Sequence, residues 1–170
     1  MKRQEIHEKQ KLKKFKNLRW LTWAKNVCII MVILFLVYVS LLSIQYKEGF
    51  SQLLSDNLFV IIGFIVCTMN ILVFYDMRNI IAHIEDYTDI DTNRLKLVVY
   101  GVGQLFMFNY ASAILIFLSL YKYFRWDMGI KVIFSEIKKA QGFKNVAASL
   151  VVVIFFLALT YFISFVALTK

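Results

Sequence analysis

The first long apolar segment of the chain reads VCIIMVILFLVYVSLLSIQY, residues 27–46, and contains no charged side chain. Three further segments share this composition: Leu58–Tyr75, Leu97–Tyr121 and Val146–Leu168. Each has about the length that an α-helix needs to cross ~30 Å of hydrocarbon at ~1.5 Å per residue. We therefore predict an all-α membrane protein whose fold is a bundle of four transmembrane helices.

The composition of the whole chain indicates the same class. Of its 170 residues, 60% are hydrophobic, whereas a soluble domain has roughly 45–50% apolar residues. The connections between the four segments are too short for a separate globular domain, so we expect residues 1–170 to form one membrane domain. Cys28 and Cys67 fall at different depths of their predicted helices, and we expect both to be buried and not bonded to each other.

The segment before the first predicted helix, residues 1–26, is strongly basic. It holds nine lysines and arginines against Glu5 and Glu8, and such a block is expected to stay in the cytoplasm. Four crossings then place both termini in the cytoplasm. The composition, rich in Lys, Ile, Phe and Asn, is typical of an AT-rich genome and favours a bacterial cell membrane.

The connection Lys122–Asn145 conflicts with this orientation, because it is also basic and yet would lie outside. The conflict would vanish if Leu97–Tyr121 were re-entrant, since the connection would then return to the cytoplasm. We nevertheless expect one crossing here, because the segment suits a single tilted helix and is short for a helical hairpin.

The basic tail also has the pattern of a lipid-binding helix. Leu12, Phe15, Leu18 and Leu21 recur every three residues with lysines among them, and two tryptophans follow where headgroups are expected. We expect the following residues to contact anionic lipid headgroups or a partner: Lys13, Lys14, Lys16, Trp20 and Trp23. Because these aromatic residues suit a bilayer rather than a base-stacking surface, we expect no binding to nucleic acid.

A second amphipathic pattern lies between the third and fourth predicted spans, at Ile130–Ala140. Its apolar positions fall on one helical face, and most of its polar residues lie off that face. We expect an interfacial helix that contacts the lipid surface or a partner protein through these residues: Ile130, Phe134, Ile137, Lys138 and Lys139.

The second predicted helix continues beyond the bilayer, because Met77, Ile80, Ile81 and Ile84 keep the spacing of one helical face. The turn that follows is acidic, with these carboxylates: Glu85, Asp86, Asp89 and Asp91. The turn lacks the glycine and the final glutamate of a calcium-binding loop, so we expect no metal there. We interpret it as a solvated acidic turn, with a docking surface for a basic partner as the alternative.

Several uncharged polar residues lie inside the predicted spans, namely Asn70, Gln104, Asn109 and Ser112. An amide that faces hydrocarbon is costly, so these side chains should face other helices and form hydrogen bonds there. The alternative interpretation is that they line a path for a solute or an ion.

Motifs for catalysis are missing from the sequence. No Walker loop, GxSxG or HExxH pattern occurs, and the only histidines are His7 and His83. We therefore expect neither an enzyme nor a cofactor. An enzyme that acts on lipid would need polar groups gathered near the headgroups, where Asp76, Arg78 and His83 are the best candidates.

These features favour a small membrane accessory protein. Such a protein would bind, regulate or protect a larger membrane partner without catalysis of its own, using the acidic turn and the amphipathic segments. The second hypothesis is a subunit of a homo-oligomeric transporter or channel, with a polar, uncharged path lined by Asn70, Gln104 and Asn109.

Overall fold

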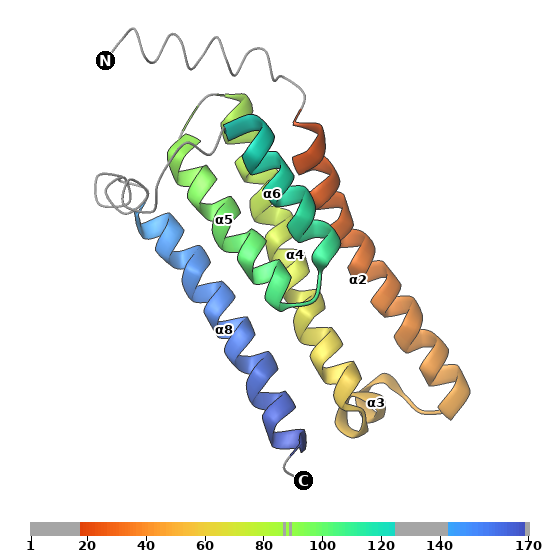
Figure 1. Cartoon of the computed structure of the whole chain (residues 1–170). Coiled ribbons are helices and arrows are strands. Elements are labelled where there is room, and N and C mark those ends of the chain that lie inside the picture. The colour runs from red at the N-terminus through yellow and green to blue at the C-terminus, as the bar shows by residue number, and fades with distance from the viewer. Residues whose placement is uncertain (1–17, 87, 89, 125–142, 169–170) are drawn as a thin grey trace, which may run out of the picture.

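The computed structural model describes residues 18–86, 88, 90–124 and 143–168, and this part of the chain is entirely helical apart from short connections. The helices, in chain order, are α2 (Arg19–Tyr46), α3 (Phe50–Asp56), α4 (Leu58–Glu85), α5 (Ile90–Phe106), α6 (Tyr110–Phe124) and α8 (Phe143–Leu168) (Figure 1).

Three of these helices, α2, α4 and α8, are long and apolar enough to cross a membrane, with mean hydropathy between 2.5 and 3.0 over their most apolar stretches. They contain the predicted segments 27–46, 58–75 and 146–168, so the prediction of membrane-spanning helices is confirmed for these three. Many of their large apolar side chains are exposed, as expected where lipid covers them. The extension of the second span is also confirmed, because α4 continues to Glu85.

The remaining predicted span, Leu97–Tyr121, is not one helix. It is divided between α5 and α6, which run in opposite directions and pack against each other (Figure 1). The prediction of a single tilted crossing is therefore wrong, and a bundle of four spans is not confirmed. The reason is local, because the backbone reverses within Met107–Asn109.

The reversal uses a helix-ending motif without glycine. Phe108 adopts the left-handed conformation, with φ of 61°. The N–H of Phe108 donates to the carbonyl of Leu105 at 3.2 Å, and that of Asn109 donates to the carbonyl of Gln104 at 2.9 Å. This pair of bonds is the Schellman arrangement, which satisfies the last carbonyls of a helix. Asn109 then begins the next helix, because its side-chain oxygen accepts the N–H of Ser112.

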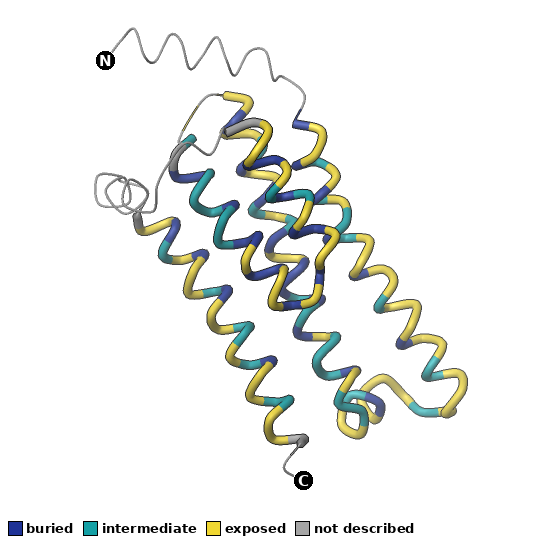
Figure 2. Tube along the Cα trace, in the orientation of Figure 1, coloured by how far each residue is buried: buried dark blue, intermediate teal, exposed yellow. Residues whose placement is uncertain are grey.

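The hairpin of α5 and α6 lies between the long helices but does not extend along their full length (Figure 1). Its 17-residue first arm is about 25 Å long, whereas the 28 residues of α2 extend about 42 Å. α6 packs on α2, α5 packs on α8, and α4 contacts α2, α5 and α8. Figure 2 shows the buried positions concentrated on the sides of the helices that meet the hairpin.

Two glycines on α5 allow these close approaches. A Cβ atom on Gly103 would lie 2.8 Å from the side chain of Val153 on α8, and one on Gly101 would lie 3.0 Å from Phe117 on α6. A larger residue at either point would force the neighbouring side chain to shift, so both glycines favour the close packing of the hairpin on α8 and of its own two arms.

The hairpin also changes which parts of the chain share an end of the bundle. The start of α2, the turn between α4 and α5, the end of α6 and the start of α8 all lie at one end, which we call the near end (Figure 1). α3 and the end of α8 lie at the other, far end. The expected arrangement with both termini on one side requires a fourth crossing and is not confirmed.

Several residues predicted to bind lipid or a partner lie outside the described part of the chain. They are Lys13, Lys14, Lys16, Ile130, Phe134, Ile137, Lys138, Lys139 and Asp89, together with the side chain of Asp91. The predicted amphipathic helix at Ile130–Ala140 belongs to the same group, so these predictions are not tested.

Candidate functional site

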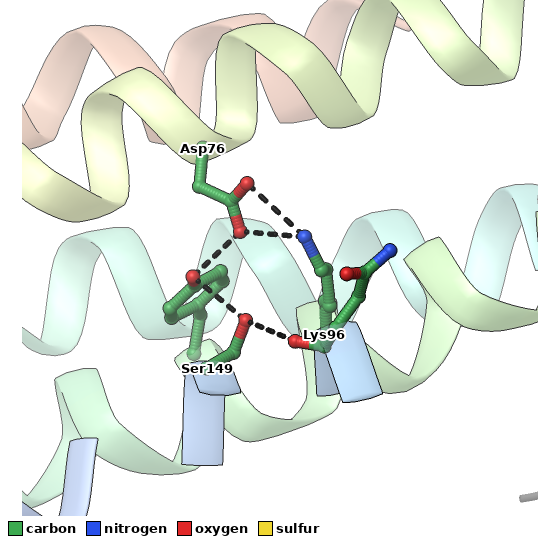
Figure 3. A network of polar contacts seen from close by, with 5 residues as sticks. Asp76, Lys96 and Ser149 are labelled. Atoms are coloured by element: carbon green, nitrogen blue, oxygen red, sulfur yellow. Dashed lines mark hydrogen bonds and ion pairs between the residues drawn. The ribbon is translucent and has the colours of Figure 1, made fainter. Parts of the chain in front are cut away.

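A charged cluster joins three helices at the near end. Asp76 on α4 accepts hydrogen bonds from Lys96 and Tyr100, both on α5 (Figure 3). The Lys96 ammonium lies 3.2 Å from each carboxylate oxygen, and the Tyr100 hydroxyl lies 2.6 Å from Oδ2. Tyr100 also lies 3.1 Å from the hydroxyl of Ser149 on α8, which in turn donates to the backbone carbonyl of Asn145. We call Asp76, Lys96, Tyr100 and Ser149 the Asp76 network.

The position of the Asp76 network along the helices explains why charge is tolerated there. Asp76 lies about 27 Å along α4 from Leu58, at ~1.5 Å per residue, close to the expected thickness of the hydrocarbon layer. The side chains of Lys96 and Asp76 keep 15% and 24% of their surface exposed. With Leu58 placed at one edge of the hydrocarbon layer, the pair lies near the opposite headgroup level, where partial solvation lowers the cost of burying two charges.

A polar pocket of about 200 Å³ opens beside this network. Most of its wall is polar, and it is lined by Asp76, Asn79, Ile80, His83, Thr92, Asn93, Lys96 and Asn145. The wall comes from α4, the first turns of α5 and the start of α8. One carboxylate, one ammonium, one imidazole and three amides thus face a single space of small-ligand size.

The end of α4 fixes one side of this pocket. The ring of His83 lies 3.0 Å from the hydroxyl of Thr88, which also bonds to the backbone carbonyl of His83. Of the three residues proposed from sequence for a headgroup-level site, Asp76 and His83 line the pocket, whereas Arg78 is exposed and is not part of its wall.

Sequence reasoning did not find the Asp76 network, because Asp76 and Lys96 fall just outside the predicted spans and are separated by a turn. One signal was present in the sequence. Lys96 and Tyr100 are four residues apart, and this spacing places their side chains on one face of a helix. A carboxylate on a neighbouring helix is the natural partner of both groups.

A second polar cluster surrounds the tip of the hairpin. Its members are the four residues predicted from sequence, Asn70, Gln104, Asn109 and Ser112, and we call it the hairpin-tip cluster. All four are buried. The amide of Asn109 donates to Asn70 at 3.1 Å, which ties the tip to the middle of α4. Ser112 lies 3.2 Å from the sulfur of Cys28 on α2.

The hairpin-tip cluster is not fully satisfied. Within the described part of the chain, neither the nitrogen nor the oxygen of the Gln104 side chain has a hydrogen-bond partner, and the Asn70 nitrogen has none either. Gln104 is fully buried, with 0% of its surface exposed. An amide in this state costs roughly 1–3 kcal/mol unless water or a ligand meets it.

The described residues of the predicted contact surfaces lie at the near end. Trp23 is exposed, and Trp20 is exposed at the rim of the bundle, where the ammonium of Lys122 lies 5.6 Å from its ring centroid. Glu85 and Asp86 are exposed at the end of α4. Cys28 and Cys67 are both buried and free.

Comparison with known proteins identifies no relative. No family model, no curated protein and no solved structure matches the chain. Among the described residues, no group of three or more His, Cys, Asp or Glu side chains is arranged to hold a metal ion.

Proposed function

We propose that this chain is a membrane accessory protein that binds, regulates or protects a larger membrane partner through the polar near end of its bundle, without catalysis of its own. The observation that supports this proposal is the return of the hairpin. It brings the start of α2, the acidic residues Glu85 and Asp86, and the helix ends on either side of the basic connection between α6 and α8 to the same end.

The distribution of charge supports an orientation for this proposal. Every lysine and arginine except Lys47 and Lys170 lies within residues 2–25, 78–96 or 122–144. The described residues of these three segments lie toward the near end. By the positive-inside rule the near end faces the cytoplasm. The chain then crosses a bacterial cell membrane three times, enters it once more as a re-entrant hairpin, and ends outside.

Cysteine labelling tests this orientation. Glu85→Cys and Lys144→Cys should be labelled from the same side of the membrane, and Ser51→Cys on α3 should be labelled from the opposite side. The background for all three is a variant in which Cys28 and Cys67 are replaced by Ala. Labelling of positions 85 and 144 from opposite sides would restore the four-crossing arrangement and remove the common docking end.

Site-specific photocrosslinking tests the binding function itself. A photoreactive residue at Asp86 or Lys25, at the near end, should give a discrete heavier product in native membranes. The same residue at Ser51 is the matched control and should give none. A protein that purifies alone in mild detergent and forms no product from either near-end position is not an accessory subunit.

The hairpin-tip cluster favours a second candidate function, a subunit of a homo-oligomeric transporter or channel. Broken helices whose ends meet near the middle of the bilayer are a common way to build a solute site in transporters. The buried side chain of Gln104, which lacks a partner within the described residues, is the specific observation. Solute flux into liposomes that is lost in Asn109→Leu, but kept in the exposed control Asn26→Leu, would support this function.

A further inference from the structure

The pocket beside the Asp76 network has a balanced set of charges. Among the described residues, its wall holds one carboxylate, Asp76, and one ammonium, Lys96, and these two groups are paired with each other. The other polar contributors are amides, a hydroxyl and the imidazole of His83. A lone cation or a lone anion bound here would leave an uncompensated charge in a partly desolvated space, which is unfavourable.

A ligand with both charges avoids this penalty. Its anionic group can take hydrogen bonds from Lys96, and its cationic group can donate to Asp76, so that the bound state stays neutral. The remaining wall suits an oxyanion, because the amides of Asn79, Asn93 and Asn145 supply N–H donors without adding charge.

The size and depth of the pocket narrow the chemistry further. A volume of about 200 Å³ is below the ~300–1,000 Å³ of a drug-sized site. With Leu58 at one edge of the hydrocarbon layer, the pocket lies at the opposite headgroup level, because Asp76 is about 27 Å along α4. A compact phosphate ester of an amino alcohol satisfies both conditions.

We propose that this pocket binds a zwitterion of the phosphoethanolamine type, with its phosphate toward Lys96 and its ammonium toward Asp76. The same chemistry is carried by the headgroup of phosphatidylethanolamine and by small soluble zwitterions. The ligand binds between Asp76 and Lys96 and replaces their direct contact. Tyr100 keeps its hydrogen bond to Asp76 and holds the carboxylate in place. The proposal does not depend on the protein having a protein partner.

Calorimetric titration of the purified full-length protein in a maltoside detergent tests the charge requirement. Glycerophosphoethanolamine should bind, whereas glycerol phosphate, which has only the anion, and ethanolamine, which has only the cation, should bind at least roughly tenfold more weakly. Equal binding of glycerol phosphate, or no binding of the zwitterion, overturns the proposal.

Variants then locate the site. Lys96→Met should abolish binding, but it also removes the partner of Asp76 and can lower stability. Asn79→Trp avoids this problem, because it fills the pocket from an exposed position and leaves the ion pair intact. Arg78→Gln, exposed and outside the wall, is the matched control. Binding of the zwitterion by Asn79→Trp as tight as by wild type overturns the assignment.

A final comparison separates the two sources of ligand. Short-chain phosphatidylethanolamine and glycerophosphoethanolamine are titrated against the same preparation, with short-chain phosphatidylglycerol as the anionic control lipid. Tighter binding of the zwitterionic lipid supports a headgroup site, and equal binding of the two zwitterions supports a site for a soluble molecule. Preference for phosphatidylglycerol contradicts the proposal.

Discussion

The Asp76 network and the hairpin-tip cluster are both polar and both lie between packed helices, but they differ in charge and in burial. The first contains full charges and lies toward the near end, where Lys96 and Tyr100 both donate to Asp76 and the side chains of the ion pair are partly exposed. The second contains only neutral groups, lies near the middle of α4, and leaves amide atoms of Gln104 and Asn70 without partners within the described residues. The kind of polar group therefore depends on its depth in the bundle, with the charged groups of the Asp76 network toward one end and the uncharged amides of the hairpin-tip cluster in the interior.

The same contrast separates two roles. The Asp76 network ties α4, α5 and α8 together and should contribute stability. The hairpin-tip cluster fixes the tip through the hydrogen bond between two amides, but it also buries amide atoms without partners among the described residues. Such atoms are typical of a site that binds water, a solute or a partner. Substitutions in the two clusters should therefore change the free energy of unfolding by different amounts, and at one position the change should be in the opposite direction.

Asp76→Ala is expected to have the largest effect. It leaves the ammonium of Lys96 without its partner and removes the acceptor of Tyr100, so we expect a loss of about 2–3 kcal/mol in the free energy of unfolding. Unfolding in mixed detergent micelles measures this loss. Glu85→Ala removes an exposed carboxylate from the same helix and serves as the control. Equal stability of the two variants would contradict the stabilising role of the network.

Asn109→Leu should cost about 1–2 kcal/mol, because it removes both the cap of α6 and the hydrogen bond to Asn70. The same unfolding assay applies, with Asn26→Leu on the exposed side of α2 as the control. If Asn109→Leu were as harmful as Asp76→Ala, the two clusters would not differ in the way proposed.

Gln104→Leu provides the sharpest test, because it should not destabilise the protein, in contrast to the two preceding substitutions. It replaces an amide that lacks partners with an apolar side chain of similar size, so stability should be unchanged or raised by about 1 kcal/mol. A loss of more than about 1 kcal/mol would mean that this amide has a partner, such as bound water, in the folded protein.

Phe108→Gly should have the smallest effect, a gain of a few tenths of a kcal/mol to about 1 kcal/mol. Phe108 is exposed and has φ of 61°, which glycine adopts without steric cost. Phe106→Gly, in the last turn of α5, is the matched control and should be destabilising instead. The melting temperature in detergent distinguishes these directions, and a destabilised Phe108→Gly would argue against the left-handed turn.

The apolar segments could be predicted from sequence because composition reports the solvent around a helix. α2, α4 and α8 were found in this way, and the register of Met77, Ile80 and Ile84 extended α4 correctly. Composition does not show, however, whether an apolar segment continues in one direction or reverses as a hairpin. A hairpin and a single crossing both require a continuous apolar run, and the reversal at Phe108 has neither glycine nor proline to mark it.

The basic charge of the connection between α6 and α8 was the one feature of the sequence that argued against four crossings. It conflicted with four crossings, and a hairpin removes that conflict because it keeps the end of α6 and the start of α8, which flank the connection, at the near end. The charged site could not be predicted for a different reason. The spacing of Lys96 and Tyr100 places both on one helical face, but it does not identify Asp76 on α4 as the carboxylate that they contact.

The partial depth of the hairpin has a consequence for the bilayer itself. Among the described residues, the near half of the bundle holds α2, α4, α5, α6 and α8, whereas the far half holds α2, α4, α8 and the short helix α3 (Figure 1). An inserted molecule with this wedge shape displaces more lipid area from one leaflet than from the other. Its insertion energy then depends on membrane curvature and on the ratio of cone-shaped to cylindrical lipids.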